Sequence, residues 1–158
     1  MSQLMLDKEI LFGSLTNLFI LGWLALFIGG FMREPGKARK YLLIAGGRVI
    51  PLVLLAAFVV GWLLTRGMPG DIVSLEGVLL GYTVPGKVLS AWFEILGLAL
   101  LVSRWMVDDA AANGIPAPVL SVGLVGSFFA AAIGLLVYLL LSASWVRFAT
   151  PRRSGESG

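Results

Sequence analysis

The stretch K-V-L-S-A-W-F-E-I-L-G-L-A-L-L-V-S-R-W-M-V-D-D, residues 87–109, decides the fold class. It contains an apolar run long enough to cross a membrane and holds a carboxylate, Glu94, inside that run. An ionised side chain in hydrocarbon costs about 2.5–3.5 kcal/mol on insertion scales, so a chain usually keeps one there only where it is paired or used. Glu94 is therefore the residue that a functional hypothesis has to explain.

The composition is that of an integral membrane protein. Of the 158 residues, 58% are hydrophobic and 13% are charged, and the mean hydropathy is +0.94; soluble domains contain about 25% charged residues. We expect a single transmembrane domain over residues 1–146 and a disordered basic tail over residues 147–158. The bilayer is the expected partner, because Lys and Arg residues beside apolar runs suit lipid headgroups better than nucleic acid.

The sequence has neither cysteine nor histidine. Disulfides, thiolate chemistry and imidazole ligands are thereby excluded, and we expect neither a metal nor a cofactor. Any chemistry has to come from carboxylates, hydroxyls, amides, Arg or Lys.

Four apolar runs predict the architecture, since each has about the 20 residues that a helix needs to span hydrocarbon. We predict an all-α fold, a polytopic antiparallel bundle of four transmembrane helices over residues 10–31, 41–64, 88–107 and 119–142. Gly123, Gly126 and Gly134 in the fourth run are expected to pack against neighbouring helices. The third helix is expected to continue to Asn113, because Asn-Gly followed by prolines is typical of a helix end.

The connections carry their own signals. Residues 33–40, R-E-P-G-K-A-R-K, are predicted to form a short basic loop, and Pro51 is expected to kink the second span. Residues 71–82 show helical spacing over a length too short to span. With Asp71 as N-cap, they predict a short helix between spans two and three that lies in the interface or caps the bundle.

Four spans place both termini on the same side of the membrane. Lys and Arg residues divide about equally between the two sides, so the positive-inside rule does not choose firmly between the orientations. We favour the short basic first loop as the cytoplasmic one, in the inner membrane of a bacterium.

Three polar residues within the spans predict a common site. Asn17 and Glu94 lie at a similar depth of roughly 10 Å, and Arg48 enters from the opposite face. They are expected to form one inward-facing cluster, in which Glu94 pairs with Arg48 or, in its neutral form, with Asn17. The simpler alternatives are an ordinary interhelical hydrogen bond for Asn17, an Arg48 that extends back to the headgroups, and a cluster that only fixes helix register.

Trp92 and Arg104 in the third span complete the predicted site. Trp92 and Trp105 lie near opposite ends of the span, as aromatic residues of the membrane interface do. Arg104 and Asp108 are four residues apart and are expected to form an exposed ion pair. We take Glu94 as the candidate catalytic residue and Asn17, Arg48, Trp92 and Arg104 as candidate ligand contacts.

Several motifs resemble the abscisic-acid-deficient, neoxanthin-synthesis family of four-helix membrane proteins. The resemblance extends over roughly residues 13–140 and rests on Asn17 and Trp23, S-L-E-G-V at Ser74 to Val78, Ala91-Trp92, Leu100, Arg104, Asp109, and G-L-L-V-Y-L at Gly134 to Leu139.

The resemblance implies a role in carotenoid metabolism, because plant members are needed to convert violaxanthin, an epoxy-xanthophyll, into neoxanthin. In the family pattern Ala-Trp is followed, after one residue, by His and, five residues further on, by Asp. Those positions hold Glu94 and Ala99 here. If the family's chemistry uses the His and Asp, this chain either employs Glu94 as the acid or base or has lost that reaction.

Three hypotheses of different class remain open. The first is a protein that binds or isomerises a carotenoid of the epoxy-xanthophyll type in an intramembrane pocket. The second is a non-catalytic scaffold or accessory subunit of a larger membrane complex, or of an assembly with further copies of itself. The third, a small transporter, normally requires more intramembrane charges or broken helices than this sequence shows.

Overall fold

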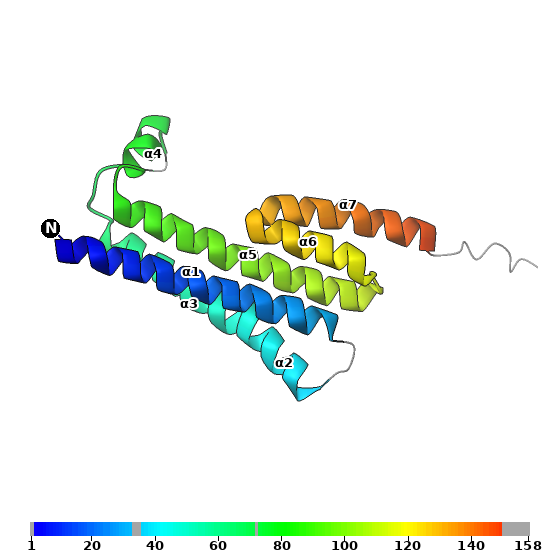
Figure 1. Cartoon of the computed structure of the whole chain (residues 1–158). Coiled ribbons are helices and arrows are strands. Elements are labelled where there is room, and N and C mark those ends of the chain that lie inside the picture. Colours follow the sequence, from blue (N-terminus) through cyan, green and yellow to red (C-terminus); the bar gives the residue numbers. More distant parts are fainter. Residues whose placement is uncertain (1, 33–35, 72, 150–158) are drawn as a thin grey trace, which may run out of the picture.

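The computed structural model describes residues 2–32, 36–71 and 73–149, and these residues form helices and short connections (Figure 1). The elements in chain order are α1 (Ser2–Phe31), α2 (Lys37–Ile44), the π-helical turn η1 (Ala45–Val49), α3 (Ile50–Leu64), α4 (Leu75–Gly81), α5 (Pro85–Asn113), α6 (Ala117–Phe129) and α7 (Ala131–Ala149). Within this described part, three helices are long and apolar enough to cross a membrane, over Glu9–Phe31, Lys37–Leu64 and Pro85–Asn113. The chain is thus an all-helical membrane protein.

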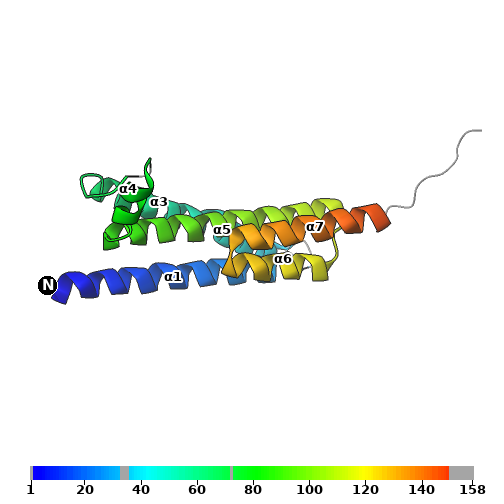
Figure 2. The ribbon, with the colours of Figure 1, turned by 90° about the horizontal axis from the view of Figure 1, so that it is seen from above.

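The three long helices lie side by side along one axis, with α1 and α5 running in the same direction and α2–η1–α3 running in the opposite direction and packing against both (Figures 1 and 2). Each helix of the bundle contributes a side chain with 0% exposure to a common core: Leu26, Leu54, Leu100, Leu124 and Tyr138. The α5 helix begins at Pro85, where its missing N–H costs nothing, and ends at Asn113 as predicted. Gly114 ends it with a φ of 63°, a conformation that glycine adopts easily.

The predicted fourth span, residues 119–142, is wrong as a single helix. The chain folds back on itself at Ala130, whose extended backbone (φ −157°, ψ 110°) separates α6 from α7. The two helices form a hairpin that covers only the half of α5 and α1 near their C-terminal ends (Figures 1 and 2). Glycine makes this contact possible, because a Cβ on Gly134 would lie 2.6 Å from the carbonyl oxygen of Gly123, and one on Gly126 would lie 2.8 Å from the Cα of Gly134.

Hydrogen bonds between side chains attach the hairpin to the long helices. Ser103 and Ser127 are both buried and their Oγ atoms lie 2.7 Å apart. The indole Nε1 of Trp23 donates to the carbonyl oxygen of Leu124 at 3.0 Å. At the far end, the hydroxyl of Tyr138 donates to Asp109 at 2.7 Å. Polar bonds in an apolar environment fix the register of α6 and α7 against α1 and α5.

The second helix begins earlier than predicted and contains a π-helical turn. Residues Lys37–Lys40, expected in the loop, form the first turn of α2, while residues 33–35 of that loop lie outside the described residues. The irregularity expected at Pro51 takes the form of η1, immediately before it. Inside this turn Gly46 and Gly47 are buried, because a Cβ on Gly46 would collide with α1 and a Cβ on Gly47 would lie 2.6 Å from the side chain of Arg104.

The short helix between the second and third long helices is present as α4, although its cap differs from the prediction. Ser74, not Asp71, is the N-cap, and its hydroxyl accepts from the N–H of Gly77 at 3.0 Å. Asp71 accepts instead from the N–H groups of Val73 and Ser74 before the helix begins. The position of α4 in the membrane interface stays a prediction. The α7 helix continues to Ala149, so the predicted tail starts later than residue 147, and residues 150–158 lie outside the described part.

Candidate functional site

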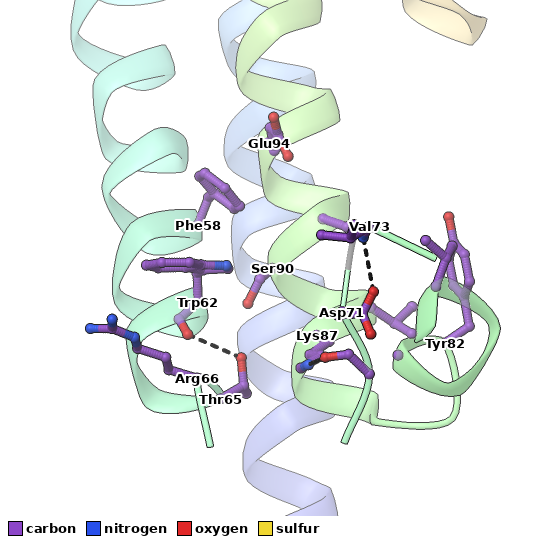
Figure 3. Close-up of a pocket in the computed structure, with 15 residues that line it drawn as sticks. Phe58, Trp62, Thr65, Arg66, Asp71, Val73, Tyr82, Lys87, Ser90 and Glu94 are labelled. Carbon is purple, nitrogen blue, oxygen red and sulfur yellow. Dashed lines mark hydrogen bonds between the residues drawn. The ribbon is translucent and has the colours of Figure 1, made fainter. Parts of the chain in front are cut away.

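A cavity of about 520 Å³ lies between α3, α5 and the segment that contains α4. This volume falls within the range of about 300–1,000 Å³ that is usual for small-molecule sites. Figure 3 shows Phe58 and Trp62 on the α3 side, Ser90 and Glu94 on α5, and Asp71, Val73 and Tyr82 from the covering segment. The cavity therefore has aromatic and aliphatic walls with a few polar groups placed among them.

The α5 wall of the cavity follows from helical spacing. Lys87, Ser90, Ala91 and Glu94 recur at steps of three and four residues, so they share one face of α5, and all four line the cavity. Ser90 is buried, and its hydroxyl donates to the carbonyl oxygen of Gly86 at 2.8 Å. Of this face, Glu94 lies furthest from the start of the helix, nine residues or about 13 Å along the axis from Pro85.

Lys87 holds the covering segment over the cavity. Its Nζ donates to the carbonyl oxygens of Met68 and Gly70 at 3.1 and 2.5 Å, which ties the connection after α3 to the first turn of α5. Gly70 has a φ of 98°, a backbone conformation that a side chain would strain. Thr65 ends α3 beneath this segment, buried and bonded through its hydroxyl to the carbonyl oxygen of Gly61 at 2.8 Å. The segment that covers the cavity is therefore held in place by hydrogen bonds from Lys87 to backbone carbonyls.

Charged side chains of both signs line the cavity at the end where α3 finishes and α5 begins. The guanidinium of Arg66 sits 6.0 Å from the ring centroid of Trp62, a cation–π arrangement. The N–H of Ser74, and after it the N–H of Val73, hold the pKa of Asp71 below its ordinary value. The cavity therefore has one charged end beside its aromatic and aliphatic walls.

Glu94 is half-buried in the cavity wall and, among the described residues, no donor is hydrogen-bonded to it and no cation is paired with it. The other polar side chains of the same α5 face, Lys87 and Ser90, both have backbone partners. Among the described residues, the Oγ1 of Thr16 is the buried side-chain polar atom without a partner, so the carboxylate oxygens of Glu94 remain accessible from the cavity. They are therefore free to bond a molecule that the cavity takes up.

The structure does not assemble the cluster of Asn17, Arg48 and Glu94 that the sequence suggested. Asn17 is exposed on α1, on the side away from the buried Phe19 and Gly22, and it does not line the cavity. Arg48 is also exposed, because the buried glycines of η1 occupy the inward face of that turn. Of the three, Glu94 alone lines the cavity, and the reading of Arg48 as a residue that extends back to the headgroups agrees with its position.

Trp92 lies beside the cavity rather than in it. It lines a second hollow of about 460 Å³ between α1 and α5, together with Phe12 and Leu89. The rings of Phe12 and Trp92 have centroids 6.1 Å apart. This hollow lies beyond the end of the α6–α7 hairpin, and Val88 borders both spaces.

Arg104 makes two structural contacts, of which only the ion pair with Asp108 follows from sequence spacing. The predicted pair with Asp108 is confirmed, with Nε donating to the carboxylate at 2.8 Å. In addition, Nη1 reaches across to α2 and donates to the carbonyl oxygen of Leu43 at 2.6 Å. A π-helical turn shifts the register of helical hydrogen bonds and leaves a carbonyl available, and Leu43 lies two residues before η1. Arg104 thus bonds α2 to α5 at the irregular turn, and it does not line the cavity.

Several residues that shape the site carry no signal in the sequence. Phe58, Trp62 and Tyr82 lie in apolar or mixed runs where many aromatic residues simply face lipid. The bonds of Lys87 to carbonyls 17 and 19 residues away depend on the path of the connection. Helical spacing from Glu94 back to Ser90 and Lys87 is the signal that would have found the α5 wall.

Comparison with known proteins places the chain. The model of the ABA DEFICIENT 4-like family matches residues 10–138, which include all of α5 and α6 and the cavity between α3 and α5. No curated protein and no solved structure matches the chain.

Proposed function

Since the chain belongs to the ABA DEFICIENT 4-like family, which is linked to carotenoid and xanthophyll biosynthesis, we propose that its cavity binds the oxygenated end group of a carotenoid. The observation that carries the proposal is that Glu94, in the cavity wall opposite Phe58 and Trp62, has no partner among the described residues. The ring and methyl groups of such an end group suit Phe58 and Trp62, and its oxygen function supplies the partner that Glu94 lacks. The rest of the polyene extends along lipid-facing helix surfaces.

The same geometry supports an acid–base role for Glu94 with an epoxide as substrate. In its neutral form the carboxyl donates a proton to the epoxide oxygen as the C–O bond opens. The carboxylate that results accepts a proton from a carbon adjacent to the opening bond, so that the product is an isomer of the substrate and Glu94 is regenerated. In the resemblance drawn from the sequence, Glu94 takes the position of a histidine, another residue that both gives and takes protons.

The test compares Glu94→Gln with the unaltered chain in a carotenoid-producing bacterial host, with Glu76→Gln as the matched control. Glu76 is an exposed carboxylate on α4 outside the cavity. If Glu94 transfers a proton, the glutamine variant still co-purifies with pigment but yields no product, while its melting temperature in detergent is unchanged. If Glu94 only binds, pigment content falls in Glu94→Gln alone. Unchanged pigment and product in both variants would refute both roles.

The alternative of a non-catalytic scaffold is less well supported by the packing. That hypothesis expects small-residue faces on the first and last apolar runs to be free for another protein. Most glycines of these runs in the described part of the chain contact neighbours within the molecule, Gly13 being an exception: Gly22 meets Leu100 and Ile50, Gly29 meets Leu43, and Gly123 meets Tyr138 and Met106.

A further inference from the structure

The Lys and Arg side chains that the structure describes gather at one end of the molecule. Six of them lie towards the end of the molecule where α1 ends and α2 begins: Lys37, Arg39 and Lys40 in the first turn of α2, Arg48 in η1, Arg104 in the second half of α5, and Arg147 in the last turn of α7. The other end, with the start of α5 and the α4 segment, has Arg66 and Lys87. We call the first of these the basic end.

The α6–α7 hairpin produces this imbalance. A continuous fourth span would carry Arg147 across the membrane to the side of Arg66 and Lys87. Because α7 returns, it finishes on the side where α5 finishes (Figures 1 and 2). In the sequence, Arg152 and Arg153 follow within four residues of the end of α7 at Ala149.

Arg48 belongs to the basic end although it lies 11 residues into the second long helix. Helical side chains tilt towards the N-terminus of their helix, which for α2 is the basic end. Arg48 is exposed, and its aliphatic stem lets the guanidinium reach towards the headgroups. Lys37 and Lys40 are exposed at the first turn of α2 and reach the same layer, while Arg39 is bonded to the carbonyl oxygen of Gly29 at 3.1 Å.

We propose that the basic end is the surface that contacts the anionic headgroups of the cytoplasmic leaflet, and that the Glu94 cavity consequently lies towards the opposite face of the membrane. Membrane proteins retain Lys and Arg on the cytoplasmic side, where anionic lipids add roughly 1 kcal/mol per basic residue near the surface. Among the described residues, six Lys and Arg residues at the basic end against two at the other end favour one orientation, whereas an even division would favour neither. Acidic residues, which contribute little to this rule, do not alter the assignment.

This assignment also gives the side of the membrane on which the cavity lies. Arg66, Asp71 and Lys87 line the cavity at the end opposite the basic end, so the cavity lies in the half of the molecule nearer the non-cytoplasmic leaflet. The assignment rests on charge and topology alone and does not depend on what the cavity binds.

The absence of native cysteine makes the orientation directly measurable. Two single-cysteine variants at exposed positions suffice: Glu76→Cys on α4 and Ala38→Cys in the first turn of α2. In intact bacterial cells a membrane-impermeant maleimide should label Glu76→Cys and leave Ala38→Cys unlabelled until the cells are permeabilised. The reverse pattern, or labelling of both in intact cells, would overturn the proposal.

A second set of variants tests whether the basic residues cause the orientation. Replacing Lys37, Lys40 and Arg147 together by Gln should make a measurable fraction of the Ala38→Cys protein reactive in intact cells. The matched change, Arg66→Gln with Lys87 kept, should leave the labelling as it was. An orientation that stays uniform after the triple replacement would show that these residues do not set it.

Discussion

Gly134→Ala tests the helical hairpin most directly. A Cβ at residue 134 of α7 meets only backbone atoms of α6 at close range, among them the carbonyl oxygen of Gly123 at 2.6 Å. Backbone cannot rotate away as a flexible side chain can, so we take the upper part of the 1–3 kcal/mol range for overpacking, about 3 kcal/mol. Alanine recovers about 1 kcal/mol through its helix propensity. The net loss is about 2 kcal/mol, or roughly 30-fold in the folding equilibrium.

The control is Gly13→Ala, which changes a glycine of a membrane helix where nothing lies within 4 Å of the new Cβ. That variant should be neutral or slightly stabilised. In thermal unfolding in detergent, Gly134→Ala should melt about 4–8 °C below the unaltered protein, as expected for about 2 kcal/mol in a chain of this size. Equal melting temperatures for the two variants would refute the close contact between α6 and α7, and with it the hairpin.

Three further outcomes follow from the structure. Arg104→Ala should lower the free energy of unfolding in detergent by about 1.5–3 kcal/mol, because it removes a hydrogen bond from a charged guanidinium to a carbonyl of α2. Asp108→Asn breaks only an exposed ion pair and should lower it by about 0.3–0.5 kcal/mol. Equal losses would contradict the bond to α2. Asn17→Leu should leave the melting temperature unchanged or raised, since the amide faces outward, and a marked loss would show that Asn17 has an inward partner. The N–H of Ser74, as the largest cause, lowers the pKa of Asp71 below its ordinary value of 3.8. The carboxylate therefore stabilises the α4 segment fully at a pH above that ordinary pKa, and the stabilisation is lost as the pH falls through the lower pKa of the folded state. Proteolysis between α3 and α5 should increase on acidification below about pH 4, and a segment equally protected at all pH values would exclude this role.

The long helices could be predicted because their causes are local. Apolar runs of sufficient length defined α1, α3 and α5, and Asn113-Gly114 marked the end of α5. The pair of Arg104 with Asp108 followed from their separation by one helical turn. Membership of the family was also visible in short motifs, and the match over residues 10–138 confirms it.

The hairpin could not be predicted from its own sequence. Residues 119–142 are continuously apolar, and Ala130, where the chain reverses, has no turn preference. Gly126 and Gly134 were correctly identified as packing positions, but the sequence does not say that they pack against each other. The reversal depends on close packing between the two halves of the apolar run, α6 and α7, and hydrophobic periodicity in the sequence does not indicate such packing.

The site was predicted in part for a similar reason. Glu94 stood out because a carboxylate is costly in hydrocarbon, whatever surrounds it. Its proposed partners depended on which way α1 and α2 face, and the buried glycines of η1 direct Arg48 outward instead. The connection that roofs the cavity is held by bonds from Lys87 to backbone carbonyls, and such bonds leave no pattern in side-chain sequence.

The π-helical turn acts as a phase shift for the whole of α3. One residue corresponds to about 100° of rotation in an α-helix, so the extra residue accommodated in Ala45–Val49 sets the azimuth of every side chain that follows. Phe58 and Trp62 face Glu94 in this phase. Removing one residue from the turn would make the helix regular and swing both aromatic side chains out of the cavity wall, without altering a residue that lines it. The lining of the cavity thus depends partly on the length of a segment that lies more than two helical turns away from it.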